Sequence, residues 1–389
     1  MDYYCATKFT DLMVVVQSRL LYNCCKAHPE RVNLQWLEKN PGSLFHTDTM
    51  VDDRKKMLDN KSCASCHHGC YKLEEQGLTS PRQQSPNAVM DRASSRLQDP
   101  YTPLKDLTIS LTTDCNLACV YCSPEWSTTW QREVDKGGPY VMEGHEIKNT
   151  NFNTLWMKLK QKARGADNKF FKLLMNEIQL ADELETITLI GGEPLLNNQF
   201  DQLLDCAIGK RIKIFSGLGV NDTRLQKVLD KTKGMPISWK ISAEATGRYF
   251  EFLRYGLQWD DFLKKVDMIH KNGHEIEFQS TMSNLSAFDF HNFYDYFSKD
   301  FSINIQSVDG WPYMYPHVLD KQSKDECYAS LNVINGRPME VAKWLVADPT
   351  DLERRNIGAF LMQLQKRRSV DLNIFPKNFL KWCGADKPN

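Results

Sequence analysis

The chain has 389 residues, of which 41% are hydrophobic and 25% charged, a composition typical of a globular protein with room for more than one domain. Lys plus Arg and Asp plus Glu number 49 each, so the overall charge gives no clear signal for a nucleic-acid partner. No apolar run is long enough to cross a membrane, and the first residues lack the pattern of a signal peptide. We therefore expect a cytoplasmic protein without membrane association.

Residues 1–78 hold six of the 12 cysteines. In a reducing compartment, such cysteines more often bind metal than form disulfides. These cysteines are compatible with four kinds of site: an iron–sulfur cluster, a structural zinc site, a redox-active dithiol, and c-type haem on the Cys-x-x-Cys-His string. Haem attachment requires export, and a dithiol site lacks the usual βαβ surroundings. The six cysteines are Cys5, Cys24, Cys25, Cys63, Cys66 and Cys70.

A polar segment rich in Ser, Pro and Gln follows at 79–104 and is interpreted as a linker. From 105 to 318, candidate strands alternate with helical periodicity, and the tail at 319–389 is expected to be mainly helical. This alternation predicts an α/β fold with a parallel sheet curved into a partial (β/α)6 TIM-like barrel. The expected strands are 107–113, 186–190, 212–217, 237–244, 275–282 and 302–308. The clearest helical segments are 200–209, 223–232, 262–273, 339–346 and 357–368.

Three cysteines in a C-x3-C-x2-C spacing follow the first of these strands: Cys115, Cys119 and Cys122. Three thiolates this close can hold one face of a [4Fe–4S] cluster and leave the fourth iron open to a small molecule. A zinc knuckle would need a nearby fourth ligand, and the next histidine, His145, lies 23 residues after Cys122. An iron–sulfur site is therefore the preferred interpretation, with zinc or a cluster of buried thiols as alternatives.

Two further groups of residues follow later strands. Gly191-Gly192-Glu193-Pro194 follows the second; glycines let the backbone approach a ligand, and a carboxylate accepts hydrogen bonds from an ammonium group. This string is also compatible with a simple turn. Ser242 and Glu244 end the fourth strand and suit ribose hydroxyls, and the guanidinium of Arg254 suits a carboxylate. A surface ion pair is the alternative role for Arg254.

The C-x3-C-x-aromatic-C string resembles the signature of the radical S-adenosylmethionine (SAM) superfamily, with Tyr121 at the aromatic position. The resemblance implies a [4Fe–4S] cluster whose open iron binds SAM. It also implies reductive cleavage of SAM to a 5′-deoxyadenosyl radical, which abstracts hydrogen from a substrate. Tyr121 would then pack near the adenine, although it is equally compatible with a core position.

The same resemblance implies SAM-binding roles for the two groups of residues that follow the later strands. The Gly191–Pro194 string resembles the motif that binds the amino group of SAM. In related enzymes a Ser and an acidic residue at the positions of Ser242 and Glu244 contact the ribose or carboxylate, and an Arg reaches the carboxylate, as Arg254 would here. Many relatives carry Asp where Glu244 stands, and the longer Glu side chain departs from that pattern.

The N-terminal cysteines resemble a twitch domain, the auxiliary-cluster module related to SPASM domains, here placed before the barrel. This resemblance implies an auxiliary iron–sulfur cluster held by Cys5, by Cys24 or Cys25, and by two of Cys63, Cys66 and Cys70. Four protein ligands would make it an electron conduit or structural cluster, and three would leave an iron for substrate.

We expect a radical SAM enzyme that acts on an unidentified peptide, protein or small molecule and takes electrons from a partner such as flavodoxin or ferredoxin. The competing hypothesis is a non-catalytic zinc-binding interaction module. Cys206 lies on an apolar helical face and is interpreted as a core residue. Cys327 stays unassigned, and Cys383 is a remote candidate for a missing ligand or a shield of the active site.

Overall fold

The structure is a computed structural model, and it has an α/β fold with a large, mostly parallel sheet that does not close into a complete barrel. The expected fold class is therefore confirmed. The chain forms two compact units, which are described separately. The first comprises Met1–Thr112, Asn153–Lys213 and Gly234–Ile237, and the second Thr113–Phe152, Ile214–Lys233 and Ser238–Asn389. The structure describes residues 2–24, 27–77, 79–84, 98–147, 168–332 and 343–386.

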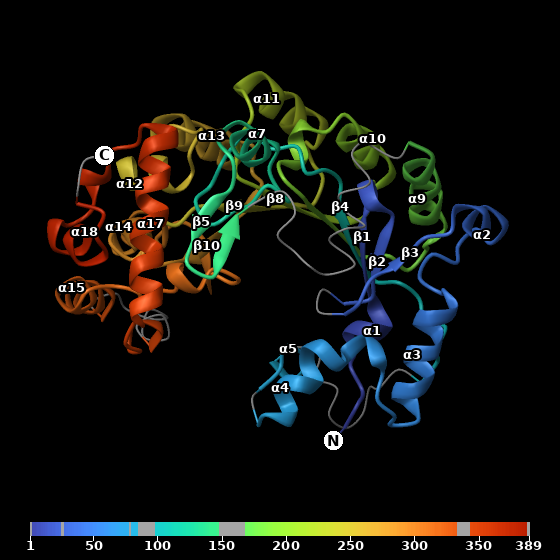
Figure 1. The fold of residues 1–389 in the computed structure, drawn as a ribbon. Helices are drawn as coiled ribbons and strands as arrows, with labels where there is room; N and C mark the ends of the chain where they lie inside the picture. The colour runs from blue at the N-terminus through green and yellow to red at the C-terminus, as the bar shows by residue number, and fades with distance from the viewer. Residues whose placement is uncertain are drawn as a thin grey trace. The chain divides into compact units, whose positions relative to one another are not determined.

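The core of the first unit is a run of parallel strands (Figure 1). Val14 pairs with Ile109, and Ile109 pairs with Leu189, so three fully buried aliphatic side chains lie in register across three strands. β-branched and aliphatic side chains favour this pleated, buried setting. Two short antiparallel strands extend this sheet beyond β1. The strands are β1 (Asp11–Val15), β2 (Leu20–Tyr22), β3 (Glu30–Arg31), β4 (Asp106–Ser110) and β7 (Thr186–Ile190).

Helices of the first unit present apolar faces to the core. In α9 the buried positions include Phe170, Leu174 and Ile178, which recur at the spacing of one helix face. The α-helices are α1 (Thr7–Thr10), α2 (Leu34–Lys39), α3 (Asp48–Leu58), α4 (Lys72–Glu75), α5 (Pro81–Gln84), α9 (Asn168–Leu180) and α10 (Gln199–Cys206). Short turns of 3₁₀ helix lie at η1 (Val16–Ser18), η2 (Ala64–Cys66) and η4 (Pro194–Leu196), and a single π turn at η3 (His67–Tyr71).

In the second unit, parallel strands pack under aromatic helices. Phe278 pairs with Ile241 on one side and Ile303 on the other, and its ring lies 4.2 Å from that of Phe297 and 5.5 Å from that of Phe293 (centroid distances). The strands of this sheet are β9 (Ile237–Ser242), β10 (Glu275–Met282) and β11 (Ser302–Ser307), and β8 (Arg211–Ser216) runs along the chain from the first unit into the second. A separate hairpin consists of β5 (Tyr140–Met142) and β6 (His145–Ile147).

The helices of the second unit include a C-terminal group. Helix α17 begins with a capping box, in which Thr350 and Glu353 satisfy each other's backbone N–H groups. Gly358 of α17 lies so close to α18 that a Cβ there would be 1.9 Å from the Cys383 carbonyl oxygen, so these two helices pack only with glycine at this position. The α-helices are α7 (Thr128–Gly137), α11 (Asp222–Lys231), α12 (Gly247–Leu253), α13 (Trp259–Lys271), α14 (Phe290–Phe297), α15 (Lys321–Asn332), α17 (Asp351–Arg368) and α18 (Lys377–Cys383). The 3₁₀ turns are η5 (Pro312–Met314), η6 (Lys343–Leu345) and η7 (Leu372–Ile374).

All six expected strands are present, with ends that differ by up to three residues. The largest difference is in β4, which ends at Ser110 instead of residue 113. The helical tail is present over 351–368, whereas part of the expected helix 339–346 lies outside the described residues. The proposed domain boundaries stay a prediction.

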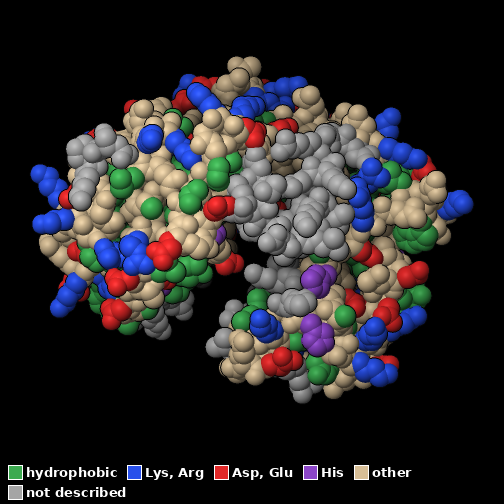
Figure 2. All heavy atoms as spheres, in the orientation of Figure 1, with side chains coloured by type: hydrophobic (Ala, Val, Ile, Leu, Met, Phe, Trp, Pro, Cys, Tyr) green, Lys and Arg blue, Asp and Glu red, His purple; other side chains and the backbone are tan. Residues whose placement is uncertain are grey.

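Basic and acidic side chains are interspersed on the face shown in Figure 2. Among the helices that the structure describes, none is long and apolar enough to span a bilayer.

Candidate functional site

The loop that carries Cys115, Cys119 and Cys122 lies in the second unit, directly before α7. Cys119 is 9% exposed, and the other two side chains are half-buried. Burial raises the pKa of the Cys119 thiol, and it raises that of Cys122 to about 12. Both thiols are therefore protonated at neutral pH in the metal-free protein, and binding a metal would release their protons.

The backbone of this loop is held by side chains from other elements. The Ser127 hydroxyl donates to the Leu117 carbonyl at 2.6 Å, and the Trp130 indole N–H donates to the Cys119 carbonyl at 2.8 Å. Thr129 Oγ1 donates to the Cys115 carbonyl at 2.8 Å. Ser127 is also the N-cap of α7 and accepts from the Trp130 N–H. The start of α7 thus fixes the positions of the cysteines.

Arg368, at the end of α17, completes this support. Its Nη1 donates to the Ala118 carbonyl at 2.7 Å, and its Nε lies 2.9 Å from Glu133 on α7. The guanidinium stacks on Trp130 at 4.4 Å and on Tyr255 at 4.9 Å. Helix α17 therefore reaches the backbone between the first two cysteines.

Two glycines allow other loops to approach the cysteine loop. A Cβ at Gly219 would lie 2.5 Å from Asn116 Oδ1 and 2.9 Å from Leu117 Cγ. Gly256 has φ +109°, and a Cβ there would lie 3.0 Å from the Asn116 carbonyl oxygen. Only glycine fits this crowded, left-handed position. The loop is thus enclosed on several sides by backbone.

Arg254 joins three of the predicted site residues. Its Nε and Nη2 lie 3.1 and 2.5 Å from the two carboxylate oxygens of Glu244, a bidentate ion pair. Its Nη1 lies 3.7 Å from Cys119 Sγ, and its guanidinium lies 5.1 Å from the centre of the Tyr121 ring. Glu244 is fully buried, and Arg254 is 6% exposed. Arg254 does form an ion pair, which was the alternative to a SAM-binding role, but the pair is buried against a cysteine thiol instead of lying on the surface.

Tyr121 is fixed through its backbone as well as its ring. The Trp311 indole N–H donates to the Tyr121 carbonyl at 3.0 Å. Burial raises the pKa of the Tyr121 phenol well above its ordinary value, so the hydroxyl stays protonated. The neighbouring strand β9 ends at Ser242, a half-buried residue that leads to Glu244.

The Gly191–Pro194 string lies in the first unit, after β7. Gly191 has φ +144°, and a Cβ there would lie 2.5 Å from the Thr112 carbonyl oxygen. The Gly192 N–H donates to that same carbonyl at 2.8 Å. Glu193 is 1% exposed and caps η4 by accepting from the Leu195 N–H. The string is therefore a close-packed turn that buries a carboxylate at the end of a sheet strand.

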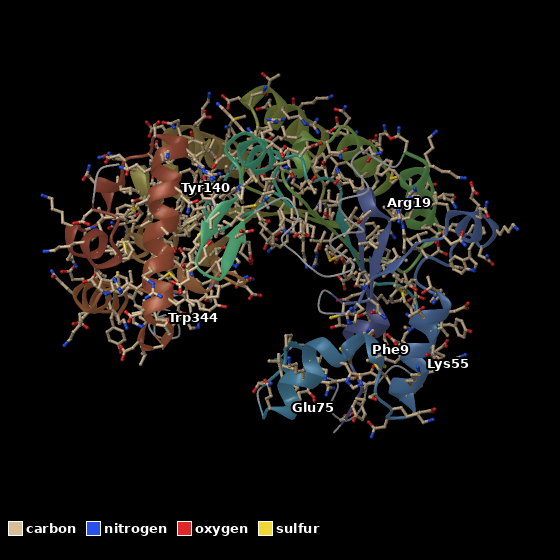
Figure 3. The ribbon with its side chains drawn as sticks, in the orientation of Figure 1. Phe9, Arg19, Lys55, Glu75, Tyr140 and Trp344 are labelled. Atoms are coloured by element: carbon tan, nitrogen blue, oxygen red, sulfur yellow. The ribbon has the colours of Figure 1, made fainter. Side chains whose placement is uncertain are left out.

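The N-terminal thiols form a second group in the first unit. Burial, followed by the charge of Cys24, raises the pKa of Cys5 to about 12, with smaller effects from Cys66 and Cys70. Cys63 is fully buried, and its Sγ donates to the Asp53 carbonyl at 3.2 Å. Phe9, labelled in Figure 3, packs with Cys5, Cys63, Cys66, Tyr4 and Tyr71 in one buried cluster. Cys25 lies outside the described residues.

The donor chemistry of both groups fits iron–sulfur ligation. No described cysteine forms a disulfide, and reduced thiols are the normal ligands of such clusters. As the side chains lie, no three His, Cys, Asp or Glu residues in the described ranges form a ready-made metal site. Cys327 and Cys383 are buried in the helical part of the second unit, where Cys383 Sγ donates to the Leu380 carbonyl. Cys206 is half-buried on α10.

Sequence reasoning missed Trp130, Arg368, Gly219 and Gly256. Only the capping pattern at Ser127 gave a local signal, since a Ser before a helix predicts an N-cap. The other contacts join residues far apart in the chain, such as Arg368 and Ala118, which are 250 residues apart.

Residues 109–292 match the model of the Radical SAM superfamily, so the chain contains a radical SAM domain, as the cysteine motif predicts. Members of this superfamily use a [4Fe–4S] cluster and SAM, and the chemistry they share is SAM-dependent radical chemistry. A comparison with curated proteins finds no match.

Solved structures with detectable similarity include radical SAM enzymes. One is anSMEcpe with bound AdoMet and a Cp18Cys peptide (15% identity, TM-score 0.40, covering 59% of each chain). Another is SuiB of Streptococcus suis bound to S-adenosylmethionine (12% identity, TM-score 0.31, covering 77% of this chain and 62% of that chain). SuiB bound to its precursor peptide SuiA gives 13% identity and a TM-score of 0.35, covering 94% and 71%. The chain thus spans about 59% of the length of anSMEcpe.

Proposed function

We propose that this protein is a radical SAM enzyme whose catalytic [4Fe–4S] cluster is held by Cys115, Cys119 and Cys122. The single observation that carries the proposal is the loop itself. Its three cysteines, none of which forms a disulfide, lie on a backbone already fixed by Ser127 and Trp130. When bound, the cluster and SAM would supply a 5′-deoxyadenosyl radical that abstracts hydrogen from a substrate.

Each of the two units holds predicted site residues with the chemistry to bind SAM. Glu193 is a buried carboxylate suited to the amino group of SAM. Gly191 and Gly192 keep the turn before it compact, and Pro194 begins the 3₁₀ turn η4. In the second unit, we assign the ribose and carboxylate of SAM to Ser242, Glu244 and Arg254, and the adenine to the region of Tyr121.

Arg254 has a specific part in this proposal. Glu244 accepts from two of its three nitrogens, Nε and Nη2, and the third, Nη1, lies against Cys119. A guanidinium held in this way cannot rotate freely, so it would present a fixed positive charge beside the cluster-binding loop. The SAM carboxylate would therefore bind the N–H groups of Arg254 that Glu244 does not use.

For the N-terminal thiols we propose an auxiliary iron–sulfur cluster bound by Cys5, Cys24, Cys66 and Cys70. The support is that Cys5 and Cys66 pack in one buried cluster, and that Cys24, Cys66 and Cys70 all contribute to the raised pKa of Cys5. Cys63 instead donates to a backbone carbonyl and is assigned a packing role. With four protein ligands, this cluster would transfer electrons and have no iron free for substrate.

The substrate we propose is a peptide, protein or small molecule with an abstractable hydrogen. The electrons would come from a reductant of the flavodoxin or ferredoxin type in the cytoplasm. Both assignments are open to direct test by supplying candidate partners to the reduced enzyme.

The decisive experiment measures SAM cleavage. Protein purified without oxygen, reduced with dithionite and given SAM is expected to release 5′-deoxyadenosine. Replacing Cys115, Cys119 and Cys122 together by Ala should abolish release, whereas Cys206→Ala, a half-buried thiol of α10, should not. Unchanged release from the triple variant would overturn the assignment. Stoichiometric zinc without iron would favour the zinc-binding module instead.

A further inference from the structure

A buried ammonium group lies among the N-terminal thiols. Lys8 is on α1, and its side chain is fully buried. Its Nζ has three acceptors: Asn23 Oδ1 at 2.6 Å, Asp53 Oδ2 at 2.9 Å and Ser65 Oγ at 2.8 Å. An ammonium group has three N–H donors, so each is matched by one acceptor. The group is therefore fixed in position as well as buried.

Two of the three partners of Lys8 are next to cysteines in the chain. Asn23 directly precedes Cys24, and Ser65 directly precedes Cys66. Ser65 Oγ lies 3.9 Å from Cys66 Sγ. The backbone N–H of Lys8 itself donates to the Cys5 carbonyl at 3.0 Å. One charged group thus connects the three segments that bring Cys5, Cys24 and Cys66 together.

Fold stability alone gives a poor reason for this arrangement. Burying an ammonium and a carboxylate removes both from water, and a well-packed apolar pair of similar volume often stabilises a protein equally well. The Asp53 side chain is only 6% exposed, so solvent screens the pair little. A charge pair held this firmly beside thiols has an electrostatic effect on whatever the thiols bind.

We propose that Lys8 and Asp53 set the reduction potential of the auxiliary iron–sulfur cluster, with Lys8 favouring its reduced form. This inference rests on the proposed auxiliary cluster. Reduction adds one electron from an external donor and breaks no bond, so the cluster gains one negative charge. A nearby ammonium stabilises that charge and raises the potential, and a nearby carboxylate lowers it. Lys8 is thus a positioning residue whose charge also acts on the cluster.

The test uses two substitutions that change the charge in opposite directions. In the full-length chain with Cys115, Cys119 and Cys122 replaced by Ala, only the N-terminal cluster would give a signal. Its potential is measured by electron paramagnetic resonance during a titration with dithionite and mediators. Lys8→Met should shift the potential to more negative values, and Asp53→Asn should shift it to less negative values. Lys8→Arg, which keeps the charge, should stay near the parent value.

A matched control comes from the same helix as Asp53. Lys56 pairs with Asp52 on the surface of α3, where the two side chains are 43% and 58% exposed. Lys56→Met should leave the potential unchanged, because water screens an exposed charge. If Lys8→Met does not fold, Asp53→Asn still tests the sign, since its amide oxygen can accept from Lys8.

The outcomes distinguish failure of the electrostatic role of Lys8 and Asp53 from failure of the auxiliary cluster. Unchanged potentials in Lys8→Met and Asp53→Asn, with the cluster intact, would overturn the electrostatic role. Shifts of the same sign in both variants would also overturn it, because they would indicate a disturbed loop. Absence of iron from the triple cysteine variant would instead overturn the auxiliary cluster itself, and with it this role of Lys8.

Discussion

At the scale of single residues, Gly191 has the strictest requirement in the predicted SAM-binding turn. It combines a φ of +144° with a carbonyl oxygen, that of Thr112, in the space where a Cβ would lie. The first feature disfavours any L side chain, and the second requires the backbone to move. The turn therefore depends on the absence of a single carbon atom.

We predict that Gly191→Ala lowers the free energy of unfolding by about 2–3 kcal/mol and weakens SAM binding, since the turn must open. Denaturant titration and equilibrium binding measure the two effects. Gly209→Ala is the matched control: its φ is +82°, but a Cβ there meets nothing within 4 Å. It should cost about 1 kcal/mol and leave SAM affinity unaltered. Equal effects of the two substitutions would contradict the role of the close contact.

Arg368 shows why some site residues escape sequence analysis. Basic residues in the last turn of a helix are common, because they complement the helix dipole. Nothing local distinguishes Arg368 from its neighbour Arg367, yet Arg368 is buried and donates to the Ala118 carbonyl, 250 residues earlier in the chain. The cysteine motif, in contrast, was recognisable because its three cysteines lie within eight positions of one another.

At the scale of elements, helix α17 supports the cysteine loop through Arg368 and the β5 hairpin through the adjacent Arg367. Arg367 lies 3.9 Å from the centre of the Tyr140 ring, labelled in Figure 3, and donates to the carbonyls of Gly138 and Pro139 at 2.6 Å. The two adjacent arginines thus have similar chemistry and different targets.

This difference gives a paired test. Arg368→Lys should keep the charge beside Glu133 but lose the planar set of donors that reaches Ala118, at a cost of about 1–2 kcal/mol in loop stability. We expect it to lower the iron content of the catalytic site and the SAM-dependent spectral change there. Arg367→Lys should leave both near the wild-type level. Equal iron content in the two variants would argue against support of the loop by α17.

The pairing of β1 with β4 places two carboxylates opposite each other. Asp11 is in register with Asp106, and burial, with a smaller effect from Asp106, raises the pKa of Asp11 to about 6. Thr10 Oγ1 donates to Asp11 at 2.6 Å, and Lys213 partly offsets the increase. The folded protein therefore holds this proton more tightly than the unfolded chain, in which the pKa is about 4.

A raised carboxyl pKa has a defined sign for stability. Between about pH 4 and 6 the folded state binds more protons, so the free energy of unfolding should fall as the pH rises through this window. Asp11→Asn should remove this component and raise stability at pH 7 by on the order of 1 kcal/mol. Asp106→Asn should narrow the pH range over which stability falls, because it removes the contribution of Asp106 to the raised pKa of Asp11. Denaturant unfolding at several pH values measures it, and identical pH profiles for wild type and Asp11→Asn would refute the assignment.

The strands were predictable to different degrees for a physical reason. Five of the six barrel strands end within two residues of their expected ends, because apolar runs bounded by turns carry local information. Strand β1 was missed. Its partner β4 lies beyond the linker, so the pattern in Asp11–Val15 says nothing about pairing. Local sequence patterns predict where strands and helices lie, whereas the pairing of strands far apart in the chain is seen only in the folded structure.

At the scale of the whole molecule, iron should divide between two sites. We predict that the triple Ala variant of Cys115, Cys119 and Cys122 keeps about half of the wild-type iron if both clusters are of the same type. A variant with Cys5, Cys24, Cys66 and Cys70 replaced should keep the other part, together with SAM-dependent signals. Iron and sulfide analysis measures the division. Complete loss of iron in the first variant would indicate a single cluster.

The pairing of β1 with β4 also has a consequence for biosynthesis. The strands meet across 95 residues, the separation between Gln17 and its partner Thr112 at their far ends. At about 5–20 residues per second, a ribosome would need roughly 5–20 seconds to make that stretch. During this interval the early cysteines emerge while the strand that completes their sheet is still untranslated. Loading of iron into the N-terminal group would therefore have to wait for later parts of the chain, or be assisted by a carrier that protects newly made thiols.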